Sequence, residues 1–162
     1  MNIMVTYMSQ TGNTKRVAES IFEEVQGEKE LKELSEVENL DGYDLTFVGF
    51  PMQAFGPAQA AKDFLVNNCN GKKIALFTTH GVTQDFEELP AWLDNCRQAV
   101  SGATVVGLFD CQGEVAEFLL DAVAKSDDPL MQKLAGAGAT GKGQPDAASL
   151  DRARAFAREM TA

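Results

Sequence analysis

The chain has 162 residues, and its 24 acidic side chains against 14 basic ones give a formal net charge of −10 at pH 7. A surface of this charge argues against binding to nucleic acids or anionic membranes, because phosphate contacts require clustered Lys and Arg. The composition, 44% hydrophobic and 23% charged, is typical of one ordinary globular domain, here residues 1–162. No signal peptide or membrane-spanning run is visible, so we expect a cytoplasmic protein with no membrane association.

The N-terminal segment predicts a strand, a polar loop and a helix. Residues 3–7 (IMVTY) are apolar and β-branched, and the polar residues 9–14 follow them directly. Asn13 is a favourable helix N-cap, and apolar residues recur after it at helical spacing up to Val25. The alternating charges of residues 30–34 suit a strand at the edge of a sheet.

The same strand, loop and helix unit repeats along the chain. Nearly all-apolar strands separated by amphipathic helices predict a parallel sheet covered on both faces, so we expect a doubly wound α/β domain of about five strands. The further expected strands are residues 45–49, 73–78 and 104–109, and the expected loops are residues 51–57 and 79–89. One helix is expected to start near Pro57, and two more are expected at residues 90–100 and 115–123. The last expected helix contains Leu150, Ala153, Ala157 and Met160.

Residues 126–144 interrupt this pattern and contain two glycine motifs. Gly136-x-Gly138-x-x-Gly141 matches a dinucleotide fingerprint but lacks the strand that must precede it. Residues 136–142 also match a P-loop, yet Gly143 stands where a Ser or Thr hydroxyl must reach Mg²⁺. We interpret both matches as accidental and the whole segment as an excursion from the domain.

The thiols and the single histidine do not indicate a metal site. Cys69, Cys96 and Cys111 are odd in number and widely spaced, and His80 has no ligand partner at loop or helix spacing. We expect neither disulfides nor metal. Cys96 lies on the apolar side of its helix and is expected in the core, and Cys111, at the end of the last strand, is expected to be an inert thiol.

The polar loop after the first strand predicts an anion site. Hydroxyls, a side-chain amide and backbone N–H groups converge there at the positive end of a helix, which is what a phosphate needs in the absence of a cation. The lack of a P-loop lysine favours a monophosphate over a triphosphate. The alternative is a well-capped helix whose loop binds nothing. The candidate residues are Ser9, Gln10, Thr11, Gly12, Asn13 and Thr14.

The motif S-x-T-G-N-T directly after the first strand resembles the FMN-phosphate loop of the flavodoxin family. The order and spacing of the strand and helix units up to Val123 are also similar to that family. The resemblance implies a five-stranded parallel sheet in the order 2-1-3-4-5, with FMN at the carboxyl ends of the strands. It also implies that residues 9–14 hold the FMN phosphate.

Two later loops would then flank the flavin ring. Phe55 or Met52 could pack on the ring, Gly56 could allow an unusual backbone geometry, and the second loop could offer backbone N–H groups to the flavin pyrimidine. The alternatives are a turn that buries Phe55 in the core, and a solvent-facing His80. The candidate residues are Pro51, Met52, Gln53, Ala54, Phe55 and Gly56 in the first loop, and Thr78, Thr79, His80 and Gly81 in the second.

The sequence departs from the best-known flavodoxins because the first loop has no Trp and the second has no Tyr. Trp92 is expected in a helix, too far along the chain to replace them. An aromatic pair around the ring is therefore expected to be one-sided, which would leave room for a substrate above it. Acidic residues after the second loop, at positions 85, 87 and 88, are candidates for lowering the flavin potential.

The resemblance implies an FMN-binding electron carrier that serves redox partner proteins with basic docking surfaces. On this interpretation the protein has no substrate of its own. Two alternatives remain: an FMN-dependent NAD(P)H or quinone reductase of the same fold, and an interaction module that has lost the flavin.

Overall fold

The computed structural model describes residues 1–162 and is built around a parallel β-sheet. The strand order is β2-β1-β3-β5-β6, which confirms the predicted five-stranded arrangement. A sixth, two-residue strand, β4 (Gly56–Pro57), was not predicted and pairs antiparallel with the end of β3. The five parallel strands are β1 (Asn2–Tyr7), β2 (Glu28–Glu33), β3 (Leu45–Gln53), β5 (Lys73–His80) and β6 (Thr104–Gln112).

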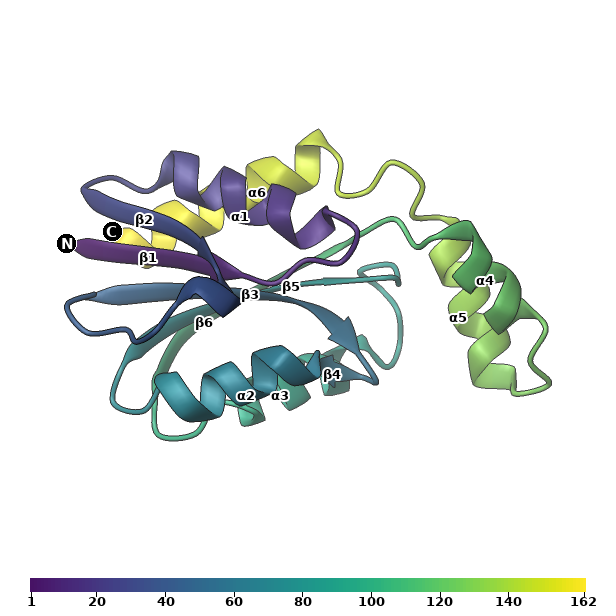
Figure 1. Ribbon diagram of the computed structural model, residues 1–162. Helices are drawn as coiled ribbons and strands as arrows, with labels where there is room; N and C mark the ends of the chain where they lie inside the picture. The colour runs from purple at the N-terminus through teal and green to yellow at the C-terminus, as the bar shows by residue number, and fades with distance from the viewer.

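Helices cover both faces of the sheet (Figure 1). Helices α1 (Asn13–Glu24) and α6 (Ala147–Thr161) lie on one face, and α2 (Gln59–Asn68) and α3 (Leu89–Gln98) lie on the other. A short 3-10 helix, η1 (Leu34–Glu36), follows β2.

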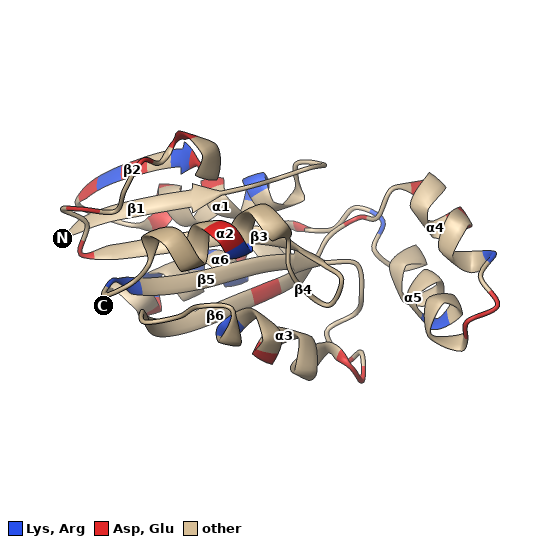
Figure 2. Ribbon diagram, turned by 60° about the horizontal axis from the view of Figure 1, so that its bottom comes forward, with Lys and Arg blue, Asp and Glu red and all other residues tan.

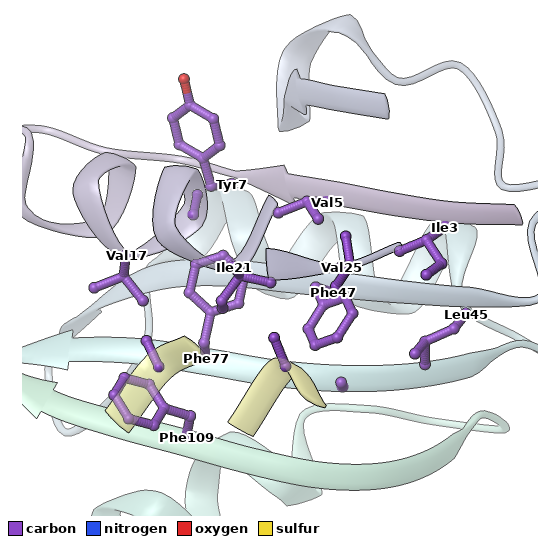
Figure 3. Close-up of a cluster of buried hydrophobic side chains, with 14 of the residues drawn as sticks. Ile3, Val5, Tyr7, Val17, Ile21, Val25, Leu45, Phe47, Phe77 and Phe109 are labelled. Atoms are coloured by element: carbon purple, nitrogen blue, oxygen red, sulfur yellow. The ribbon is translucent and has the colours of Figure 1, made fainter. Parts of the chain in front are cut away.

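Successive side chains of the central strands point to opposite layers, because the period of a strand is two residues. Phe47 packs with Ile21 and Phe77 beneath α1 and α6 (Figure 3), whereas the next residue, Val48, packs with Leu65 beneath α2. All five side chains are fully buried. Burial of each such side chain contributes roughly 1.5–3 kcal/mol, so the two layers hold the sheet rigidly.

The three cysteines are buried, which agrees with the predicted core position of Cys96 and with the inert thiol predicted for Cys111. Burial raises the pKa of Cys69 to about 11 and the pKa values of Cys96 and Cys111 to about 12. Cys96 lies in the layer beneath α2 and α3, and Cys111 in the layer beneath α1 and α6. None of the three is a reactive thiolate at neutral pH.

The predicted excursion, residues 126–144, contains a helix. Helix α5 (Pro129–Ala139) begins after Asp128, whose side chain accepts a hydrogen bond from the N–H of Leu130. It pairs with α4 (Glu117–Ala124) as a helical hairpin that stands beyond the carboxyl edge of the sheet (Figure 1). Gly136 and Gly138 lie inside α5, so neither glycine motif forms a phosphate-binding loop.

Several predicted boundaries were wrong at the carboxyl ends of the strands. Strands β3, β5 and β6 continue to Gln53, His80 and Gln112, because residues beyond the predicted ends still pair with neighbouring strands. The N-cap of α1 is Gly12, at φ 93°, and Asn13 is already helical. None of the helices combines the length and the apolar character needed to cross a lipid bilayer.

Candidate functional site

The carboxyl ends of β1, β3, β5 and β6 surround two adjoining cavities. The polar cavity, of about 130 Å³, is lined by the loop after β1 together with residues from the ends of the other strands. The apolar cavity, of about 190 Å³, lies against the hairpin of α4 and α5. The two cavities share Met52, His80, Gly81, Val115 and Leu119.

The loop at the start of α1 presents unpaired backbone N–H groups to the polar cavity. The Ser9 hydroxyl oxygen accepts hydrogen bonds from the N–H of Gly12 (3.1 Å) and of Lys15 (3.3 Å), which closes the loop over the helix end. The left-handed φ of Gly12 makes this turn possible. Four N–H groups, those of Gln10, Thr11, Asn13 and Thr14, have no partner within the chain.

This arrangement fits an anion held by dipoles rather than by opposite charge. The positive end of the α1 dipole and the free N–H groups converge on the cavity, and no Lys or Arg lines it. Lys142 lines a neighbouring groove that also touches Thr11 and Asn13. The geometry therefore agrees with the predicted preference for a small monophosphate.

Two side chains predicted as ligands also fasten the loop to the rest of the site. The hydroxyl oxygens of Thr14 and Thr79 lie 2.8 Å apart in a buried hydrogen bond between α1 and β5. The side-chain amide of Asn13 donates to the carbonyl oxygen of Glu114 at 3.0 Å. The loop predicted to hold the phosphate is therefore braced against both β5 and the segment after β6.

The loop at residues 51–56 is a strained hairpin between β3 and β4. Ala54 and Phe55 have φ values of 48° and 65°, whereas Gly56, the residue expected to adopt unusual geometry, does not have a positive φ. Phe55 is 37% exposed rather than in the core, and its ring stacks on Trp92 with centroids 4.9 Å apart. The expectation that Trp92 lies too far along the chain was wrong, because α3 brings it to the wall of the apolar cavity.

The second predicted loop is largely the end of β5. The Thr78 hydroxyl donates to the carbonyl oxygen of Phe50 (2.9 Å) and so has a structural role. His80 is only 6% exposed, so the solvent-facing alternative was wrong, although its ring lines both cavities. Gly81 follows the strand, lines both cavities, and has a backbone N–H without a partner in the chain.

His80 forms a buried pair with Asp110 of β6. The two side chains meet at 2.8 Å through Nε2 and Oδ2, and the N–H of Val82 donates to Nδ1 at 3.4 Å. Nδ1 is therefore an acceptor and Nε2 carries a proton. Burial raises the pKa of Asp110, but hydrogen bonds from His80 and Gln84 outweigh this effect and leave its pKa below the ordinary value. A negative charge on Asp110 therefore lies next to His80, which lines both cavities.

The acidic residues before α3 are partly neutralised. Lys133 of α5 lies 2.9 Å from a carboxylate oxygen of Glu88 and 3.4 Å from one of Glu87. The hydrogen bond from Lys133 lowers the pKa of Glu88. Of the three acidic positions singled out in the sequence, only Asp85 has no ion-pair partner.

The structure brings most of the predicted site residues together. Gly12, Gln53, Gly56 and Thr78 do not line either cavity, and the other predicted residues do. Sequence reasoning missed the contribution of the hairpin and of α3. The apolar spacing on α4 indicated a packed face but not what the face covers. The residues missed in the apolar cavity are Val82, Trp92, Val115, Leu119, Leu120, Val123, Leu134 and Ala135.

Comparisons with known proteins agree with the fold and with the motif after β1. A family model described as Flavodoxin domain matches residues 4–158. The Flavodoxin-like domain-containing protein BilS of Clostridioides difficile (strain CD3) is 32% identical over 124 residues, which cover 74% of this chain and 70% of that protein.

Solved structures show the same fold at lower sequence identity. A flavoprotein from Lactobacillus acidophilus NCFM, in complex with FMN, is 23% identical with a TM-score of 0.55, over 67% of this chain and 92% of that one. The two-electron reduced flavodoxin of Megasphaera elsdenii is 24% identical with a TM-score of 0.54, over 85% and 98% of the respective chains. The family match over nearly the whole chain and the curated relative confirm the predicted family: the chain belongs to the flavodoxin domain family.

Proposed function

We propose that the protein binds FMN and carries electrons between redox partner proteins, without converting a substrate of its own. The observation that supports this most directly is the cluster of unpaired N–H groups at the start of α1, next to an apolar cavity of ring-binding character. Membership of the flavodoxin domain family and the FMN bound to the Lactobacillus acidophilus flavoprotein point to the same cofactor.

The chain supplies the groups that FMN requires. The N–H groups of Gln10, Thr11, Asn13 and Thr14 would hold the phosphate, and the unpaired N–H of Gly81 would donate to a carbonyl oxygen of the ring. FMN itself supplies transfer of one or two electrons. The protein tunes this chemistry by binding the ring in apolar surroundings and by its fixed charges.

The charge of the site favours a low potential and a basic partner. The Asp110 carboxylate, kept ionised by His80 and Gln84, opposes the addition of negative charge nearby. Acidic residues also occur in the loop before α3 and in α4, where Glu117 and Asp121 are exposed (Figure 2). A partner with Lys and Arg around its own redox centre would be attracted to this end of the molecule.

Flavin titration tests the cofactor and its phosphate site. Quenching of flavin fluorescence is expected to show saturable uptake of FMN by the flavin-free protein. The double substitution Ser9→Ala with Thr11→Ala should raise the Kd for FMN at least tenfold and the Kd for riboflavin less than twofold, because only FMN carries the phosphate. Ser35→Ala, an exposed serine in η1, is the matched control. Absence of FMN uptake would contradict the proposal, and equal losses for both flavins would contradict the phosphate assignment.

Anaerobic reduction distinguishes a carrier from a reductase. NADH or NADPH alone should leave the oxidised flavin spectrum unchanged, whereas dithionite should bleach it and added cytochrome c should restore it. Rapid bleaching by a nicotinamide nucleotide would identify the protein as a reductase instead.

A further inference from the structure

Helix α5 is fixed directly against the segment that follows β5. Gly138 lies at this contact: a Cβ atom there would be 2.5 Å from Leu120 Cδ2, 3.5 Å from the carbonyl oxygen of Gly81 and 3.6 Å from a methyl group of Val115. The absence of a side chain at Gly138 therefore allows α5 to approach both α4 and Gly81. The side-chain amide of Gln112 donates to the carbonyl oxygen of Ala137 (3.2 Å) at the same end.

The other end of the hairpin is fixed to the loop before α3. Lys133 pairs with Glu88 and Glu87, and its ammonium group lies 4.6 Å from the ring centroid of Phe86. Leu134 packs against the small apolar cluster that contains Phe86 and Trp92. Two separate contacts therefore set the position of α5 at the mouth of the site.

Helix α4 rests on α5 and turns apolar side chains toward the apolar cavity. Leu119, Leu120 and Val123 line that cavity, whereas Phe118 does not line it and is 71% exposed. None of the residues of α4 is buried by the chain, and Leu119 is 46% exposed. The cavity face of α4 thus offers apolar surface that the chain itself leaves incompletely covered.

The same cavity is also lined by an aromatic pair. Phe55 and Trp92 stack with an angle of 27° between their ring planes, and both line the cavity. The cavity is continuous with the polar cavity through Met52, His80, Gly81, Val115 and Leu119. A ligand with its phosphate on the α1 loop can therefore place a ring between the aromatic pair and α4.

We propose that the hairpin of α4 and α5 is a wall of the isoalloxazine site, with Leu119, Leu120 and Val123 forming an aliphatic surface where a second aromatic side chain is missing. This inference rests on the proposed binding of FMN. The wall contacts the ring and not the phosphate, so it contributes to the binding of any flavin that carries the intact ring. It accounts for a helix with apolar side chains that packs chiefly on α5.

Substitutions on the two sides of α4 test the wall. Leu120→Ser or Val123→Ser should raise the Kd values for FMN and for riboflavin at least tenfold each, because both flavins lose the same ring contact. Phe118→Ser, on the same helix but outside the cavity, should change neither Kd more than twofold. The near 450 nm absorption band of bound FMN should lose its vibrational shoulders in the cavity variants only, since those shoulders report an apolar ring environment.

A milder substitution separates loss of the wall from loss of folding. Val123→Thr preserves the shape of the side chain but places a hydroxyl in the cavity, and it should raise both Kd values about threefold or more with an unchanged far-ultraviolet circular dichroism spectrum. The proposed wall would be contradicted if the wild type binds FMN and all three cavity variants bind both flavins as tightly as the wild type does. The proposed binding of FMN would still stand in that case. If the wild type binds no FMN, the proposed function fails and the wall fails with it.

Discussion

At the residue scale, the turn at Ala54 and Phe55 carries backbone strain. The pairing of Gln53 with Gly56 leaves only these two residues to reverse the chain, and both adopt left-handed φ values. Two-residue hairpins favour Gly or Asn at such positions, because a Cβ atom costs roughly 1–2 kcal/mol per residue there. The stack of Phe55 on Trp92 and the hydrogen bond from Asn95 to the Phe55 carbonyl (2.9 Å) hold the turn in place.

Ala54→Gly should therefore stabilise the protein. Removing the Cβ relieves the left-handed conformation, and we expect the free energy of unfolding to rise by about 0.5–1 kcal/mol after the entropic cost of glycine. Urea unfolding of the flavin-free protein measures this difference. Ala60→Gly, at an exposed position of α2, is the control and should lose about 1 kcal/mol. A loss of stability in Ala54→Gly as large as in this control would show that the turn is unstrained.

At the scale of elements, the helices differ in how much they bury. Helix α1 buries Val17, Ala18 and Ile21 against the sheet, and its ends are fixed by the phosphate loop and β2. Helix α4 buries none of its residues and packs chiefly on α5, its neighbour in the hairpin. Since tertiary packing supplies most of the stability of a short helix, the hairpin is the element that opens most readily.

Hydrogen exchange should show this order of stability. We expect amides of α4 to exchange at least ten times faster than amides of α1 in the flavin-free protein, because α4 can open without disrupting the sheet. Addition of FMN should slow exchange in α4 and α5 but not in α2, which lies away from both cavities. Mass spectrometry of the corresponding peptides measures both effects, and equal protection of α1 and α4 before FMN is added would contradict the expectation.

At the scale of the whole molecule, the charge is large and unevenly spread. Ten acidic and four basic side chains occur in the first 50 residues, so much of the net charge of −10 lies in the part of the chain that contains the phosphate loop. The proposed phosphate site is compatible with this charge, because its N–H groups and the α1 dipole act at short range, whereas the net charge acts at longer range and is screened by salt. On the proposed function, this long-range field would attract a basic partner protein.

The rate of electron transfer should therefore depend on salt concentration, and the charge of the partner should decide whether added salt lowers or raises that rate. With reduced protein, the rate of cytochrome c reduction should fall roughly tenfold or more between low and physiological ionic strength, because attraction between acidic and basic proteins is screened. The rate with ferricyanide, a small anion, should rise over the same range. Stopped-flow absorbance measures both reactions, and a parallel change in the two rates would show that the net charge does not steer association.

Much of the fold could be predicted because its causes are local. Apolar runs such as residues 73–78 are long enough to be buried only in a covered parallel sheet, and the polar loop between β1 and α1 has its binding groups adjacent in sequence. The ends of β3, β5 and β6 could not be predicted, because polar residues such as His80 are held there by partners on other strands. Burial of a histidine depends on Asp110, 30 positions further along.

By itself, the sequence determined the parallel α/β sheet, the family motif after β1 and the overall acidity, and it predicted a site for a small anion. Only the tertiary structure decided that Trp92 meets Phe55, that His80 is paired beneath the site, and that α4 and α5 close one side of the apolar cavity. The physical reason is how far apart in the sequence the interacting residues lie. Strand pattern and helix polarity arise between residues close in sequence, whereas the walls of a cavity are set by packing between elements that the chain brings together only when it folds.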